Sequence, residues 1–251
     1  MPTTYFKNIK TVLYSFGDFE GVNFFNDLTQ TVAVVDAINN ATTYNKYTIL
    51  SGDRPDILSF KFYGTVDYYW TFFLLNPHIK ESGWPIPTYD LLDETKAKYP
   101  YRTIVTNDDI SKNFPVGQTV TDSNGMTGTV IRKIPELGQL IVDNGEEINT
   151  TAFGKINENI GYRDTVEETD ITATILAESA QYNSIHHYEN SNKEYVDLTL
   201  FDFNNPAASL TPITYRERLE LKNEELKSIL VINPSLIEAV ISEYKLLMRQ
   251  R

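Results

Sequence analysis

The stretch that decides the fold is YTILSGDRPDILSFKFYG, residues 47–64. It begins as a short apolar strand and predicts a helix after its Ser-Gly turn. Asp53 can cap that helix, and Pro55 suits the first helical turn, where its missing N–H leaves no bond unmade. Gly64 ends the helix, because the residue after a last turn often takes a positive φ that glycine adopts without steric cost.

A second helix follows directly in TVDYYWTFFLLN, residues 65–76. Thr65 can cap it, and the Asn76-Pro77 pair stops it. Its apolar residues recur at helical spacing and predict one buried stripe. The stripe consists of Val66, Tyr69, Trp70, Phe73 and Leu74.

The chain can then return to the first strand. After a loop that contains Gly83-Trp-Pro-Ile-Pro87, Thr88 to Leu92 can form a short strand beside Tyr47 to Leu50. This strand–helix–helix–strand order is the layout of a LysM module, which we expect over residues 45–100.

Two stretches resemble one known family. Residues 52–64, the aromatic pair with Trp70 and the Leu-Leu-Asn76 end resemble the small LysM-containing baseplate wedge protein of contractile-tailed bacteriophages, the T-even phage wedge-closing subunit family. Residues 214–233, followed by an amphipathic segment ending YKLLM at 244–248, resemble that family's closing "Tyr…Asn-Glu…Leu-Arg/Lys…Ile" helical element. The matches are separate and in the correct order, and the middle of the chain does not match the T-even phage member.

The resemblance implies a structural virion protein without enzymatic activity or cofactor. It would be assembled in the host cytoplasm and lie in the tail baseplate, clamping neighbouring wedges through contacts with other wedge and hub proteins, in six-fold arrangement around the tail. We expect one contact surface on the LysM-like helices, around Arg54, Tyr63, Tyr68 and Trp84. We expect a second on the C-terminal helix, at Leu236, Ile237, Val240, Ile241, Tyr244 and Met248.

The sequence predicts an α+β chain with an inserted β domain at residues 111–163. Short alternating or apolar strands are separated by the turn sequences Asp122-Ser-Asn-Gly125 and Pro135-Glu-Leu-Gly138. Their density suggests a small barrel resembling SH3-like folds. The predicted strands are 114–120, 128–132 and 139–143, and Ile160-Gly161 begins a closing strand.

Three further segments complete the organisation. A β-hairpin is predicted at 171–204, with strands Tyr182 to His187 and Glu194 to Phe203 around an Asx-rich turn. Residues 1–44 form an N-terminal arm whose segment 31–38 reads equally as a strand or a helix start, and the arm can pack on its own unit or reach a neighbour.

Residues 213–251 predict two helices. The first carries a stripe of Leu219, Leu226, Ile229 and Leu230 and ends at Asn233-Pro234. The second, residues 236–248, repeats apolar residues at i, i+3, i+4 and i+7 almost without interruption. Its face either covers this chain's own sheet or meets a helix of a partner.

The charge is strongly negative, −12 over 251 residues, with a pI near 4.7. Residues 103–212 alone carry 17 acidic and 6 basic side chains. Such a surface repels phosphate backbones, so nucleic acid is not an expected partner. Acidic patches attract basic protein partners.

Cysteine is absent from the sequence, which excludes disulfides and thiolate chemistry. The first residues lack the apolar region of a signal peptide, and no window approaches the ~20 apolar residues of a membrane span. We therefore expect no membrane insertion.

No catalytic or metal constellation stands out. His186 and His187 are adjacent, and neighbours on a strand point to opposite faces, so they are not expected to share a metal, while His78 is far away in sequence. The acidic pairs at 146–147 and 167–168 read as solvated surface rather than a glycosidase pair, because that chemistry is set by spatial separation.

The alternative function is a peptidoglycan- or chitin-binding module that places a lytic partner on the cell wall. Aromatic residues of the LysM-like unit can stack on sugars. Tyr69, Trp70 and Phe73 lie on the predicted buried stripe, which leaves Tyr63, Tyr68 and Trp84 as the exposed candidates.

Overall fold

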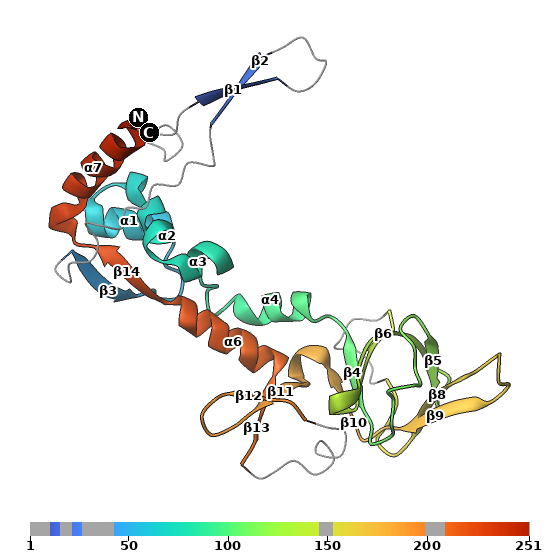
Figure 1. Cartoon of the computed structure of the whole chain (residues 1–251). Helices are drawn as coiled ribbons and strands as arrows, with labels where there is room; N and C mark the ends of the chain where they lie inside the picture. Colours follow the sequence, from blue (N-terminus) through green and yellow to red (C-terminus); the bar gives the residue numbers. More distant parts are fainter. Residues whose placement is uncertain (1–10, 16–21, 27–42, 146–152, 199–208, 251) are drawn as a thin grey trace. The chain divides into compact units, whose positions relative to one another are not determined.

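The structure is a computed structural model, and it describes residues 11–15, 22–26, 43–145, 153–198 and 209–250 (Figure 1). Helices and strands both contribute substantially, so the chain is α+β as predicted. It divides into two compact units. Unit 1 combines residues 1–88 with 223–251, and unit 2 is residues 89–222.

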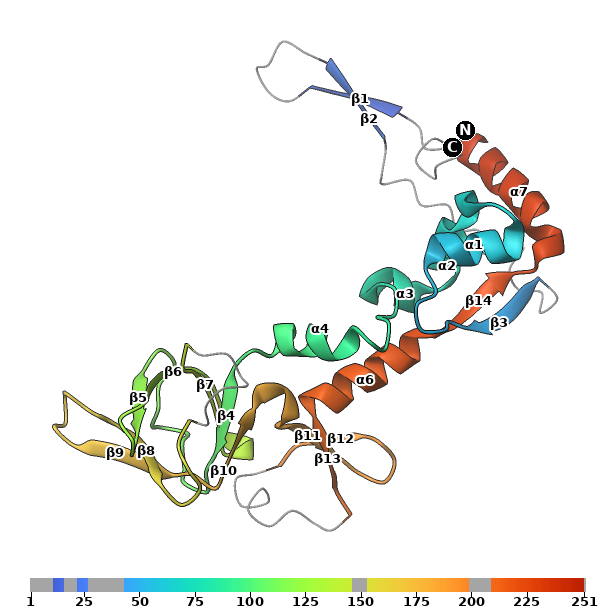
Figure 2. The same cartoon turned by 180° about the vertical axis from the view of Figure 1, so that it is seen from behind.

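Unit 1 contains a two-stranded antiparallel sheet whose strands come from opposite ends of the chain. Strand β3 pairs with β14 over five residue pairs, from Tyr44 opposite Ile232 to Thr48 opposite Ser228. Figures 1 and 2 show α1 and α2 on one side of this sheet. The elements are β3 (Tyr44–Thr48), α1 (Pro55–Tyr63), the 3₁₀ turn η3 (Val66–Tyr68), α2 (Trp70–Leu75), α3 (Pro77–Ser82), β14 (Ser228–Ile232), the 3₁₀ turn η6 (Pro234–Leu236) and α7 (Ile237–Gln250).

Local signals for α1 are confirmed in part. Pro55 occupies the first turn, and Gly64 ends the helix with φ 71°, its N–H donating to the carbonyl of Phe60. Asp53 is not the cap. Arg54 takes the cap position, and the Asp53 carboxylate instead accepts hydrogen bonds from the Leu50 N–H and the Tyr47 hydroxyl.

The predicted strand at Thr88 to Leu92 is wrong. The structure has a turn at 88–90 and then α4 (Leu91–Lys98), the first helix of unit 2. The strand that β3 pairs with lies instead at Ser228–Ile232, so the prediction that Ile229 and Leu230 continue a helix is also wrong. These residues belong to the run Ile-Leu-Val-Ile, in which three of the four residues are β-branched, and such a run favours a strand once an open strand edge is available.

A buried asparagine holds the other edge of β14. The Asn76 side chain donates to the Leu230 carbonyl at 2.9 Å and accepts from the Leu230 N–H at 2.8 Å. It also donates to the Phe72 carbonyl at the end of α2. The amide thus takes the place of a neighbouring strand and fixes β14 between β3 and the helices.

Unit 2 is built on a curled seven-stranded antiparallel sheet. Its order is β10-β4-β7-β6-β5-β8-β9, so its two outer strands are consecutive in the chain and only Ile175 and Leu176 lie between them. Because so short a link joins both edges, the sheet must curl towards closure (Figure 1). The strands are β4 (Arg102–Val105), β5 (Thr119–Asp122), β6 (Thr127–Ile134), β7 (Gln139–Asp143), β8 (Asn159–Arg163), β9 (Asp170–Thr174) and β10 (Ala177–Ala180).

This sheet contains the predicted insertion and extends beyond it. The strand predicted at 139–143 is confirmed, and that at 128–132 lies within β6. The strand predicted at 114–120 is mostly wrong, because residues 114–118 form a bend and a turn and β5 begins only at Thr119. Both predicted turns occur. In the first, the Asp122 carboxylate accepts from the N–H groups of Asn124 and Met126, and the second is the short 3₁₀ helix η4 (Pro135–Leu137). Strands β4, β9 and β10 were not predicted.

A smaller three-stranded sheet completes unit 2, in the order β12-β11-β13. The predicted hairpin appears as β11 pairing with β12 around Asn190, whose side chain accepts from the N–H groups of Asn192 and Glu194. Residues 199–203 of the predicted second strand lie outside the described residues. The elements are the 3₁₀ turn η5 (Gln181–Asn183), β11 (Ile185–Glu189), β12 (Tyr195–Val196), β13 (Thr211–Thr214) and α6 (Tyr215–Leu226).

The N-terminal arm is described only as the antiparallel hairpin β1 (Thr11–Ser15) and β2 (Val22–Asn26). The segment 31–38 lies outside the described residues.

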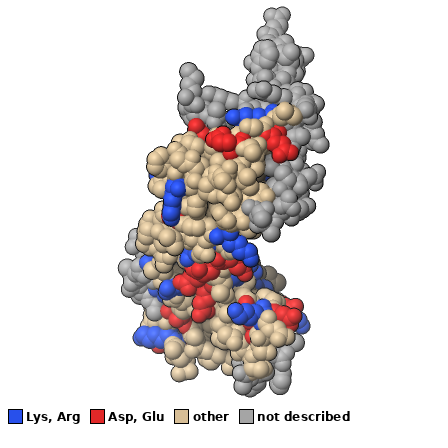
Figure 3. Space-filling model, turned by 90° about the vertical axis from the view of Figure 1, so that its left-hand side faces the viewer, with Lys and Arg blue, Asp and Glu red and all other residues tan. Residues whose placement is uncertain are grey.

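Figure 3 shows one face of the molecule, on which acidic and basic side chains lie interspersed between wide areas that carry neither.

Candidate interaction surface on unit 1

Arg54 is the predicted contact residue that remains open to solvent. Its guanidinium pairs with the Asp56 carboxylate through two hydrogen bonds of 2.9 and 3.2 Å, and 70% of the side chain is exposed. An exposed ion pair of this kind contributes little to stability. The charge is therefore available to a partner at the start of α1.

Trp84 is not the exposed residue that the sequence suggested. Its indole N–H donates to the Asp53 carbonyl at 2.7 Å, and its ring packs at 5.8 Å from Phe73 and 6.2 Å from Phe72. The side chain is half-buried and anchors the loop 83–87 onto the start of α1. It is a core residue with one satisfied polar atom.

Tyr63 and Tyr68 tie the helices to the C-terminal segment. The Tyr63 hydroxyl donates to the Ile232 carbonyl at 3.2 Å, and burial raises its pKa to about 12. The Tyr68 hydroxyl donates to the Glu238 carboxylate at 2.9 Å, with burial and then that carboxylate raising its pKa. Both hydroxyls are therefore engaged within unit 1.

Tyr69 reverses its predicted role. It was placed on the buried stripe, yet it is 38% exposed, whereas Trp70 next to it is buried. The segment begins with the 3₁₀ turn η3, which has three residues per turn, and only then becomes the α-helix α2. The change of period shifts the phase of the side chains, and a uniform helical pattern places Tyr69 on the wrong face.

The C-terminal helix α7 packs on its own chain. Ile237, Ile241 and Tyr244 are buried in a cluster with Trp70 and Ile232. The sequence left two alternatives for this face, packing on its own chain or contact with a partner's helix. These buried side chains pack on their own chain. Val240 is half-buried, Leu236 lies exposed in η6, and the side chain of Met248 lies outside the described part of the chain.

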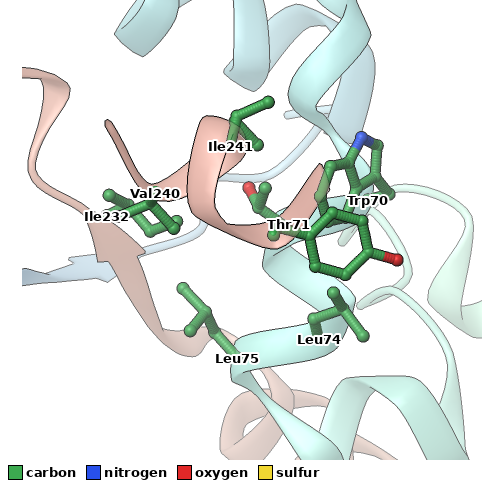
Figure 4. A pocket seen from close by; sticks show the side chains of 8 residues that line it. Trp70, Thr71, Leu74, Leu75, Ile232, Val240 and Ile241 are labelled. Atoms are coloured by element: carbon green, nitrogen blue, oxygen red, sulfur yellow. The ribbon is translucent and has the colours of Figure 1, made fainter. Parts of the chain in front are cut away.

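A small apolar notch lies between α2 and α7. Its enclosed space is only about 10 Å³, room for roughly one water-sized group. Figure 4 shows α2 and α7 facing each other across it, with Ile232 of β14 at one end. The lining residues are Trp70, Thr71, Leu74, Leu75, Ile232, Val240, Ile241 and Tyr244.

The outer face of α1 was missed by sequence reasoning. Ile57 and Phe60 are one turn apart and are 53% and 61% exposed, beside Arg54 and Lys61. Residues three apart on a helix share a face, so these side chains form an apolar strip with basic ends. The sequence did contain a signal for this surface. The apolar residues of α1 lie all around the helix, so one core cannot bury all of them.

The prediction that the adjacent histidines point to opposite faces is wrong. The Nδ1 atoms of His186 and His187 are 3.0 Å apart, so the rings do not point to opposite faces. The register of β11 against β13 shifts between Ile185 and His187, a bulge that turns consecutive side chains to the same side. His187 Nε2 lies 3.2 Å from the Glu189 carboxylate. In the described residues, no three His, Asp or Glu side chains converge to hold a metal ion.

Comparison with known proteins adds no assignment. No protein-family model and no curated protein matches this chain. Among the helices that the structure describes, none combines the length and apolar character needed to cross a membrane.

Proposed function

We propose that this protein is a structural component of a contractile-tail baseplate, which clamps neighbouring wedge subunits together through protein contacts. One observation carries the proposal. The two sequence segments that resemble the baseplate wedge family, residues 52–76 and 214–248, contribute α1, α2, β14 and α7 to unit 1, and only residues 214–222 of the second segment belong to unit 2. The unmatched middle forms most of unit 2.

The order of elements in unit 1 supports a LysM-like assignment with one change. A LysM module runs strand, helix, helix, strand along a continuous chain. Here the last strand is β14, which follows unit 2 in the sequence and pairs antiparallel with β3. Unit 2 is then an insertion into the module, and its curled sheet is the part that we assign to an SH3-like fold.

The contact surface that fits this role is the outer face of α1 together with Arg54. Its two large apolar side chains, Ile57 and Phe60, are each more than half exposed. Exposed apolar patches commonly mark protein–protein contacts. The buried residues of α7 act behind this surface by holding the helices in place.

The test is co-expression with candidate wedge proteins, followed by mass determination by light scattering. We expect a defined hetero-complex. The double substitution Ile57→Asp and Phe60→Asp should abolish it, because the contact would then bury two unpaired carboxylates. The matched control is Val116→Asp with Val166→Asp, which adds the same two negative charges in place of exposed apolar side chains of unit 2.

The cell-wall reading is the other outcome of this experiment. A monomer that ignores the wedge proteins and binds chitin oligomers or murein fragments would replace our proposal with a glycan-binding function. The engaged indole of Trp84 argues against that reading, because its N–H is already bonded to the Asp53 carbonyl.

A further inference from the structure

Five aromatic rings form a continuous row in unit 2. Tyr99 contacts Tyr215 at a centroid distance of 4.7 Å, and Tyr215 contacts His186 at 4.7 Å. His186 contacts His187 at 5.0 Å, and His187 stacks on Tyr195 at 4.9 Å with the ring planes 12° apart. We call these residues the ring row. It joins the end of α4, the start of α6 and the strands β11 and β12.

The ring row is rigid over most of its length and open at one end. Tyr215 and His187 are buried, and the contact of His187 with the Glu189 carboxylate fixes its orientation. Tyr195 closes the row with 60% of its surface exposed. A ring held flat against a buried imidazole offers a partner a fixed contact at small entropic cost.

Two cations of α6 flank the row. Arg218 and Lys222 lie three and seven residues after Tyr215, so they share its side of the helix. Lys222 is exposed and Arg218 half-buried. None of the ion pairs formed within the described residues includes either of them.

Two more cations approach from other elements. The Lys98 ammonium lies 5.9 Å from the centroid of the Tyr99 ring, and Arg132 projects from β6. Both are exposed, and the ion pairs of the described residues leave them out as well. Burial and then the charges of Arg218, His187, Arg132 and Lys222 hold the pKa of His186 down at about 4, so Arg132, Arg218 and Lys222 act on one place, whereas Lys98 lies at the Tyr99 end of the row.

The carboxylates nearest in sequence bind groups other than these four cations. Glu189 contacts His187, and Glu220 pairs with Arg216 at 2.8 Å. Glu217 accepts from the N–H and the hydroxyl of Thr214, capping the start of α6. Among the ion pairs of the described residues, none involves the four cations of the ring row, in a unit that is otherwise strongly acidic.

We infer that the ring row, flanked by Arg132, Arg218 and Lys222, with Lys98 at its Tyr99 end and the exposed Tyr195 at its other end, binds an acidic segment of a partner protein. The partner is inferred from charge complementarity: isolated cations in an acidic surface select carboxylates that can reach them locally. A nucleic acid fits less well, because the net charge of −12 repels a long phosphate backbone. The inference goes beyond the wedge proposal and stands without it, since it concerns unit 2 alone.

The test is fluorescence anisotropy with the full chain and a labelled octaglutamate peptide at low salt. We expect saturable binding that weakens as salt is raised. The double substitution Arg218→Glu and Lys222→Glu should weaken binding roughly tenfold or more, because it replaces two attractions with two repulsions. Tyr195→Ala should weaken it less and leave the salt dependence in place.

A matched control separates local from overall charge. Lys155→Glu with Arg163→Glu makes the same change in net charge at exposed sites of unit 2 away from the ring row. Equal losses in the two double variants, or no binding by the unchanged protein, would overturn the inference. Tighter binding of an oligodeoxythymidine than of the peptide would also overturn it, in favour of a nucleic-acid site. Circular dichroism of each variant verifies that the fold is retained.

Discussion

The two units differ in how far apart along the sequence their paired strands lie. In unit 2, β5 to β9 pair largely with strands close in sequence, and one short link returns the chain to the starting edge. In unit 1, β3 finds its partner only after the whole of unit 2 has been made, because residues 48 and 228 are opposite each other. Non-local pairing requires a large loop to be closed before it brings any gain. Unit 1 therefore depends on the C-terminal segment far more than unit 2 does.

Charge separates the units as well. Unit 2 contains 22 acidic and 12 basic side chains, whereas unit 1 contains 12 and 10, so the net charges are −10 and −2. Near-neutral unit 1 carries the exposed apolar face of α1, and acidic unit 2 carries the isolated cations around the ring row. The units thus offer contacts of different chemistry.

The largest effect should come from removing residues 228–251. This deletion takes away β14 and α7, and with them Ile229, Val231 and the α7 side chains of the core. We expect unit 1 to lose its cooperative fold while unit 2 keeps its own, because the curled sheet contains none of the deleted residues. Amide hydrogen exchange would measure this: protection should vanish over residues 43–88 and persist over β4 to β10. Protection that survives in α1 and α2 would contradict the dependence on β14.

A core substitution in α7 should be costly where the same change on α1 is not. Ile241→Ala removes a side chain that is 2% exposed, and we expect it to lower the free energy of unfolding of unit 1 by about 2–5 kcal/mol. Ile57→Ala alters an exposed side chain and should change it by only about 0.5 kcal/mol. Urea denaturation compares the two. Equal losses would mean that the face of α1 is covered in the free protein.

The sequence predicted those elements whose signals are local. Pro55 and Gly64 marked both ends of α1, and the Asx turn at 122–125 and the strand at 139–143 were found because their residues act on neighbours. The partner of β3 was missed. Residues 228–232 carry an apolar run that suits a helix or a strand, and only the open edge of β3 and the amide of Asn76 decide between them.

The candidate surface was predicted only in part for a related reason. Arg54 is exposed as expected, but the exposure of Trp84 depends on a carbonyl 31 residues away, which no local pattern reveals. Tyr69 was misplaced by a change of helical period, and the histidine pair by a bulge set by β13. Each error comes from geometry imposed by a distant or irregular element rather than from the residue type.

Asn76 tests the edge of β14 directly. Asn76→Ala removes a donor and an acceptor that serve the Leu230 backbone, leaving buried groups unpaired, so we expect a loss of about 1–3 kcal/mol in unit 1. Asn76→Asp keeps the acceptor but not the donor, and it buries a charge. Thermal unfolding of both variants should show unit 2 unaffected. A neutral Asn76→Ala would mean that pairing with β3 alone fixes β14.

His186 should make the stability of unit 2 depend on pH. Its pKa is about 4 in the folded chain and 6.5 as the ordinary value, so between these values the unfolded chain binds the extra proton. The stability of unit 2 should therefore fall as pH is lowered from about 6.5 to about 4. Urea denaturation across this range should show a flatter dependence in His186→Phe, with His78→Asn in unit 1 as the control. An unchanged slope in His186→Phe would place the titration elsewhere.

The C-terminal end of α1 should be less sensitive than the core of α7. Gly64 has φ 71° and nothing within 4 Å of the position that a Cβ would take, so the cost of Gly64→Ala is one of backbone conformation alone. We expect a loss of about 1–2 kcal/mol in unit 1, the usual cost of a left-handed conformation for an L-residue. Gly64→Asn should lose less, since asparagine tolerates this region. Denaturant unfolding compares the two variants. An equal loss would show that the cost comes from adding any side chain at this site, not from the positive φ.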